Sequence, residues 1–491
     1  MLTYYIAVPV MLVAALFIGI LLQKKKSTDV ISRIIKISTI VFITFVMINF
    51  FLPDVLVRSW HDSFLQSLRD SGAGAHVILR WLNMASFIVI PLAVFQKNKY
   101  FQRIATYFCL PVAVINFIFT YKYIEYFCMQ VYPDGAGLQT VPFFSDGFKS
   151  FLISEGFRLA FFGILCLSQL VVLSLLTVKN FKDLCFAKKE ILNTVLITLG
   201  SVYIAMPIYA LQYMFGIGDL VISNFSAIHL IWIFATIGLI VGFYFIFRKK
   251  SYDARHHFLI AVAWALMIQY SQVFNATGSL GMDTIPLQLC NLGAYLTLIM
   301  LITKNEKLFH FTLIVNVVGA LIAFMVLDIG KGNIFYIWTV HFIVAHTKVL
   351  IIPILALALK IFKPIDRSML KNFSIGFSLY FVAVFLVGTL SGIFYRIFAD
   401  PLLPAGMETP YQTFFYFNGL YMFDKETANG LVGFTDPLFD TGKITMGPFE
   451  FSPLITVLIY VVFMALCIAI ALLIYWLTRK QRRNAIDIPK L

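Results

Sequence analysis

The chain is divided into long apolar runs separated by short polar segments. A run of about 20 apolar residues is long enough to cross the hydrocarbon core of a bilayer as a helix. In lipid, every backbone amide must find its hydrogen bond within its own segment, which favours helices over other structures. The pattern predicts about thirteen membrane-spanning helices, at residues 4–22, 34–53, 76–95, 101–121, 152–177, 190–214, 227–247, 257–275, 285–303, 309–327, 335–359, 373–397 and 453–477.

Composition supports this interpretation and excludes a soluble globular protein. Of the 491 residues, 60% are hydrophobic and only 13% are charged, and the mean hydropathy is +0.88. A soluble domain has no use for so much apolar surface, because only part of it can be buried in a core. We therefore predict an all-α, polytopic helical membrane protein.

The basic residues predict the orientation of the chain. The formal net charge is +14, and most of the 38 lysines and arginines lie in alternate loops, such as 24–26 and 248–250, and in the tail 479–491. Positive loops stay in the cytoplasm, so we expect an external N-terminus and a cytoplasmic C-terminus. The positive charge is then explained by topology and by attraction to anionic lipids, and nucleic acid is not an expected partner. The six cysteines suggest no disulfide framework.

Similar short stretches in the two halves of the sequence predict two copies of one repeated unit, in the same orientation. "KKKSTD" (24–29) is echoed by "RKKSYD" (248–253), and "LNMASFIVIPLAVFQKNKYF" (82–101) by "CNLGAYLTLIMLITKNEKLF" (290–309). We divide the chain into a first, degenerate repeat (1–220), a second repeat (221–478) and a basic cytoplasmic tail (479–491). The alternative is that membrane helices share composition by chance. The first copy has Leu82 opposite Cys290, so we assign any chemistry to the second copy.

A thiol and an imidazole are expected at the same depth in the second copy. Cys290 lies about five residues below the outer end of its helix and His341 about six below the outer end of its own, at about 1.5 Å per residue. A nearby imidazole can take the proton of an attacking thiol. Amides of Gln288 and Asn291 could stabilise an oxyanion. We predict Cys290 and His341 as the catalytic pair; the alternative is that Cys290 is a small packing residue.

Other polar side chains are expected around the same pocket, because burying them in a membrane is costly unless they face a cavity or a partner. Lys348 shares a helix face with His341, and it is predicted either to anchor an anion or phosphate or to bond Asn316. No three metal ligands converge in the sequence, so we expect no metal and no cofactor. The remaining pocket candidates are Gln269, Gln272, Asn275, His346 and Asp328.

Three stretches carry a resemblance to a known family: "IPLQLCNLGAY" (285–295), "WTVHFIVAH" (338–346) and "GLYMFDKETANG" (419–430). Over about 227–478 the chain resembles the YwaF-like integral membrane family of bacteria. That family is similar to a eukaryotic transmembrane acyltransferase of ether phospholipids that uses a cysteine and a histidine. It is more distantly similar to hydrolases of fatty-acid esters. The family motif has histidine two residues after the proline, whereas Gln288 stands here.

The resemblance implies a lipid acyltransferase or acyl hydrolase in a bacterial cell membrane, with membrane lipids as partners. Two alternatives stay open. One is a transporter or flippase, which parallel repeats would suit, although the sequence shows no pair of interrupted helices of the kind that forms transport sites. The other is a non-catalytic scaffold, whose outer loops 54–75, 122–150 and 398–452 bind a partner protein or close over the pocket. The oligomeric state is left open.

Overall fold

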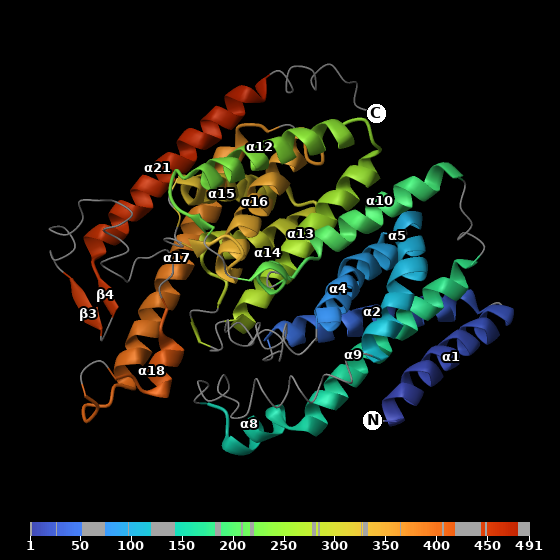
Figure 1. Ribbon diagram of the computed structural model, residues 1–491. Coiled ribbons are helices and arrows are strands. Elements are labelled where there is room, and N and C mark those ends of the chain that lie inside the picture. Colours follow the sequence, from blue (N-terminus) through green and yellow to red (C-terminus); the bar gives the residue numbers. More distant parts are fainter. Residues whose placement is uncertain are drawn as a thin grey trace.

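Helices occupy the predicted apolar runs in the computed structural model (Figure 1). Among the residues described, nine helices are long and apolar enough to cross a membrane, and three shorter ones are also apolar. The protein is therefore an all-α polytopic membrane protein. The described residues are 2–25, 27–51, 74–96, 98–118, 143–181, 188–207, 210–216, 220–276, 281–282, 285–325, 327, 332–363, 365–404, 407–417, 443–446 and 449–479.

The first half of the chain contributes one group of helices. In Figure 1 it is drawn from blue to green. A π-helical turn, η1, interrupts its fourth span, which runs from Lys99 to Ile118. The elements are α1 (Leu2–Lys24), α2 (Thr28–Phe51), α4 (Gly74–Phe95), α5 (Lys99–Ile104), η1 (Ala105–Cys109), α8 (Asp146–Ile153), α9 (Glu155–Lys179), α10 (Lys188–Ile204) and α11 (Ala210–Phe215).

The second half packs around one central helix, α15, which contacts α14, α16, α17 and α21. Large apolar side chains such as Ile231 and Phe234 of α12 remain exposed, as expected for a surface that meets lipid. The elements are β1 (Val221–Ile222), α12 (Ala227–Phe247), α13 (Tyr252–Ala276), α14 (Leu289–Thr303), α15 (Glu306–Met325), β2 (Gly332–Asn333), α16 (Ile337–Ala358), α17 (Ser368–Ile397), α18 (Pro410–Phe415), β3 (Ile444–Met446), β4 (Phe449–Phe451) and α21 (Pro453–Leu477).

Helix α13 forms the seam between the halves. It packs against α2 and α4 of the first half and against α14 and α16 of the second. The indole N–H of Trp264 donates to the carbonyl of Phe87 across this seam. Helix α13 therefore contacts both halves.

In the described part of the chain, two pairs of short strands join segments outside the helices. β1 pairs antiparallel with β2, so that Val221 faces Asn333 and Ile222 faces Gly332. The amide of Ile334 also donates to the carbonyl of Leu220 at 3.0 Å. This pairing brings the start of α12 next to the start of α16. β3 and β4 form an antiparallel pair directly before α21.

The sixth predicted span, 190–214, is not one helix, which corrects the expectation of a continuous span. Helix α10 ends at Ile204 and α11 begins at Ala210. Pro207 lies in the break, where it has no N–H to donate and restricts the residue before it. The side chain of Trp81 donates to the carbonyl of Val202 at 2.9 Å. A side chain of α4 thus bonds a backbone carbonyl in the last turn of α10.

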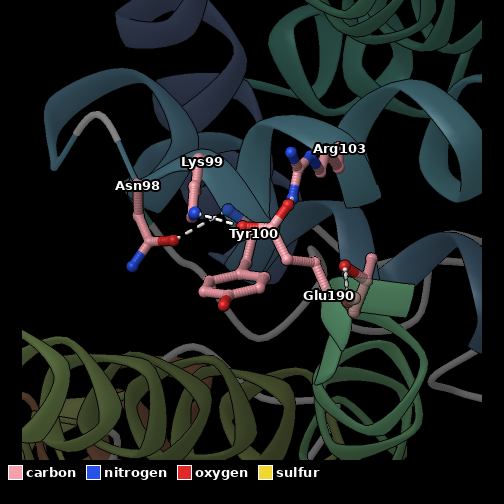
Figure 2. A network of polar contacts seen from close by, with 6 residues as sticks. Asn98, Lys99, Tyr100, Arg103 and Glu190 are labelled. Carbon is pink, nitrogen blue, oxygen red and sulfur yellow. Dashed lines mark hydrogen bonds and ion pairs between the residues drawn. The ribbon is translucent and has the colours of Figure 1, made fainter. Parts of the chain in front are cut away.

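A polar network joins α5 to the start of α10 (Figure 2). Both Lys99 and Arg103 pair with the carboxylate of Glu190, and the Arg103 nitrogen lies 2.8 Å from its oxygen. Asn98 accepts from the amide of Tyr100 at 2.9 Å and so begins α5. The Asn98 amide nitrogen also lies 3.2 Å from a ring nitrogen of His257 on α13. This end of the first half is therefore fixed both internally and to the seam helix.

Candidate functional site

Cys290 is the second residue of α14 and lies against α15. A Cβ atom at Gly319 of α15 would lie 3.3 Å from the Cys290 sulfur, so the glycine gives the thiol its room. The hydroxyl of Tyr380 on α17 donates to the carbonyl of Leu287 at 2.7 Å and fixes the chain just before the helix. The first turn of a helix leaves its N–H groups without intrahelical partners. The thiol therefore lies beside backbone donors at a helix start.

His341 lies in the first half of α16 and contacts Tyr270 of α13. The two rings meet edge to face with centroids 4.9 Å apart. The Nδ1 atom of His341 is buried and has no hydrogen-bond partner. The side chains of Tyr270 and Cys290 also lie near one another. Tyr270 is thus a common neighbour of the two predicted catalytic side chains.

The structure shows no hydrogen bond between Cys290 and His341 within its described residues. The histidine ring faces Tyr270, and the sulfur is next to Gly319. A general base must lie within about 3 Å of the proton that it takes, either directly or through one water, although apo sites are often looser. The predicted pair is therefore unbonded here, and its catalytic role stays a prediction.

Lys348 and Gln269 are brought together. The Lys348 ammonium, in the middle of α16, donates to the Gln269 carbonyl oxygen at 3.1 Å and to the carbonyl of Ile204 at 3.5 Å. The alternative prediction, that Lys348 bonds Asn316, was wrong. Its amide nitrogen donates instead to Thr297 at 2.9 Å, and its oxygen has no partner.

The remaining predicted pocket residues are only partly described. A ring nitrogen of His346 lies 2.7 Å from the carbonyl of Phe342 on its own helix. Gln288 is the N-cap of α14 without a side-chain bond to its first turn, and Asn291 follows within that turn. Gln272 and Asn275 belong to α13, but their side chains, like Asp328, lie outside the described residues.

Sequence analysis missed three features of this region. Tyr270, only 2% exposed, directly follows the predicted pocket residue Gln269. The sequence did not indicate that Tyr270 would lie near both His341 and Cys290. Tyr380 lies a long way along the chain, and nothing in the sequence links it to α14. The interruption at Pro207 had a visible signal, the proline itself.

Comparison with known proteins places a family match on this same region. Residues 221–417 match the model of the TMEM164 family. No curated protein matches the chain, and no solved structure does. The match begins at β1, includes α12–α18 with Cys290 and His341, and ends before the β3–β4 pair and α21. Residues 221–417 of this membrane protein are therefore similar to the TMEM164 family, over a shorter range than the predicted resemblance.

Proposed function

We propose that the protein is a membrane-embedded lipid acyltransferase or acyl hydrolase, with Cys290 as nucleophile and His341 as general base. The observation that best supports this is the unpartnered, buried Nδ1 of His341 beside Tyr270, which in turn neighbours Cys290. A buried imidazole nitrogen without a partner is costly. The proposal gives that nitrogen a task that a purely structural histidine would not have.

The reaction would proceed in two balanced steps. First, His341 takes the thiol proton, the Cys290 sulfur attacks the ester carbonyl of an acyl lipid, and a thioester forms. The ester bond breaks, and the released alcohol leaves with the proton from His341. Second, an acceptor alcohol or water gives its proton to His341 and attacks the thioester, so that the acyl group is transferred or hydrolysed. The thiolate then regains its proton.

Backbone groups at the start of α14 are suited to support this chemistry. The N–H groups in the first turn have no intrahelical partners, and the N-terminus of a helix favours negative charge. A tetrahedral oxyanion formed at Cys290 would lie next to them, as in other sites that use backbone donors. Tyr380 would keep this turn in place through its bond to Leu287.

The test is acyl transfer and fatty-acid release from a defined phospholipid by the full chain in nanodiscs. We expect His341→Ala to lose about 10²–10⁴-fold in rate, the usual value of general-base assistance. Cys290→Ser should lose as much or more, because a hydroxyl ionises far less readily than a thiol. An electrophilic acyl-lipid probe should label the wild type and not Cys290→Ala.

Cys109→Ser is the matched control, since Cys109 is a fully buried thiol of the first half and should not affect the rate. Gly319→Ala adds a sharper test. It keeps both proposed catalytic groups but crowds the sulfur, so it should lower the rate without unfolding the protein. Full activity in a folded His341→Ala variant would eliminate the proposed pair.

Transport of an amphiphile is the second candidate, favoured by the interruption between α10 and α11. Discontinuous helices form the substrate sites of many transporters. A transporter should move a fluorescent lipid between leaflets of proteoliposomes equally well in the Cys290→Ala variant. Lipid movement that stops in this variant would argue against transport as an independent function.

A further inference from the structure

Two lysines of the second half hold a backbone conformation that usually belongs to glycine. Lys304, at the end of α14, has a φ of 53°, and Lys360, just after α16, has a φ of 58°. The second of them is the left-handed residue of a Schellman motif, since its N–H donates to the carbonyl of Leu357 and that of Ile361 to the carbonyl of Ala356. This conformation is unfavourable for any residue with a Cβ atom. A strained position that nevertheless holds a lysine points to a role for the charge.

The two connections that carry these lysines meet at the start of α13. The Lys304 ammonium lies 4.9 Å from the centroid of the Tyr252 ring. The Tyr252 hydroxyl donates to the carbonyl of Ile361 at 3.4 Å, and the Arg255 guanidinium donates to the carbonyl of Leu359. These two carbonyls flank the second lysine in the chain. The first turn of α13 therefore brings the ends of α14 and α16 together.

Positive charge exceeds negative charge at this point. Asp253 opposes it from the first turn of α13, whereas Glu306 already pairs with Lys363 at 3.2 Å. Among the described residues, no carboxylate pairs with Lys304 or Lys360. Four exposed lysines, which we call the basic cluster, lie around the start of α13: Lys249, Lys250, Lys304 and Lys360.

Exposed apolar side chains lie directly behind the basic cluster. Ile299 and Ile302, in the last turns of α14, are exposed on one face of the helix and precede Lys304. Phe245 and Ile246 of α12 are also exposed and precede Lys249. Positive charge at the ends of the helices and apolar surface along them match the two parts of a phospholipid, its phosphate and its acyl chains.

We propose that the basic cluster binds the phosphate group of an anionic phospholipid, in the leaflet that the loop charges predict to be cytoplasmic. The phosphate lies between Lys304 and Lys360 over the start of α13, and the acyl chains follow Ile299 and Ile302 into the membrane. Basic loops attract anionic lipids in general, whereas this arrangement selects one position for a lipid. Cys290 lies at the opposite end of α14, so the site does not depend on the proposed function.

The test is equilibrium binding of phosphatidylglycerol to the full chain in detergent, measured by native mass spectrometry. Phosphatidylcholine with the same acyl chains should bind far more weakly, because its headgroup has no net charge. Raising the salt concentration should weaken the binding of phosphatidylglycerol. Equal binding of the two lipids would overturn the inference. Release of bound lipid by millimolar inorganic phosphate would overturn it too, because the site would then take a free phosphate.

The variant Lys304→Asn/Lys360→Asn separates binding from folding. Asparagine is neutral and adopts the left-handed conformation more readily than lysine, so the melting temperature should stay the same or rise. Binding of phosphatidylglycerol should fall about thirtyfold, the usual weight of two basic residues at an anionic surface. Lys304→Arg/Lys360→Arg keeps both charges and should keep the binding.

The matched control is Lys24→Asn/Lys25→Asn, which removes the same charge from two exposed lysines between α1 and α2. It should change binding by less than about twofold. An equal loss in the control would show general attraction of lipid to positive charge and would overturn the site. Unchanged binding in the folded Lys304→Asn/Lys360→Asn variant would do the same. A lower melting temperature of that variant would mean that the two lysines serve the fold, which also contradicts the inference.

Discussion

Two buried glutamines, one in each half, have opposite hydrogen-bond environments. Gln169 of α9 and Asn83 of α4 bond reciprocally, with the Gln169 nitrogen 2.8 Å from the Asn83 oxygen and the return bond at 3.4 Å. Gln269 of α13 accepts from Lys348 but leaves its nitrogen unpartnered. The first contact is complete without any other molecule, and the second is not. A closed pair serves packing, whereas the open nitrogen is one that an ordered water in the adjoining cavity can bond.

The largest expected effect tests whether the open groups of the second half are held in place. A Cβ atom at Gly293 would lie 2.0 Å from the Asn316 side-chain oxygen, whereas one at Gly163 of the first half would meet nothing within 4 Å. Gly293→Ala should cost about 3 kcal/mol, the upper end of typical overpacking costs, and Gly163→Ala should be nearly neutral. Thermal unfolding in detergent measures both. A neutral Gly293→Ala would mean that Asn316 moves freely and that its unpartnered oxygen is not a fixed feature.

The next effect concerns the closed pair itself. Asn83→Leu leaves Gln169 buried without its partner and should cost about 1–2 kcal/mol. The double variant with Gln169→Leu should recover part of that loss, because two apolar groups can replace a bonded pair. Gln269→Leu should cost more than Asn83→Leu, since it removes an acceptor of the buried Lys348 ammonium, and hydrogen bonds to charged groups contribute more than neutral ones. The opposite order in unfolding experiments would reverse the comparison.

The smallest effects come from the cations that do have a carboxylate. The Arg103 side chain is 6% exposed and that of Lys99 is 55% exposed, although both pair with Glu190. Arg103→Met should cost about 1 kcal/mol and Lys99→Met less than about 0.5 kcal/mol, because exposed ion pairs contribute little. Added salt should reduce only the Lys99 effect. Equal losses would show that burial does not distinguish the two pairs.

The sequence predicted the helices well because hydrophobicity and length alone determine which segments can cross a membrane. It did not predict the division of the sixth span, because residues around Pro207 remain apolar. A proline alone is not decisive here, since α1, α4 and α16 each contain one. The orientation and the parallel repeat stay predictions that rest on charge distribution and sequence echoes.

The candidate site was only partly predictable from the sequence. Spacing along one helix showed that Lys348 and His341 share a face, and nearby residues placed Gln269 close to them in depth. The sequence could not show which side chain of another helix each of these residues would contact. The Lys348–Gln269 contact joins residues 79 positions apart, and its geometry depends on how α13 and α16 cross. The neighbours of Cys290 come from three different helices for the same reason.

The β1–β2 pair has a consequence for how the chain assembles during synthesis. Val221 and Asn333 are paired, yet five of the helices lie between or beside them in sequence order, from α12 to α16. The ribosome must therefore produce and insert α12 through α15 before this contact can form. Until then, the chain just before α12 lacks its strand partner. The pairing therefore forms late in synthesis, just ahead of the segment that contains His341.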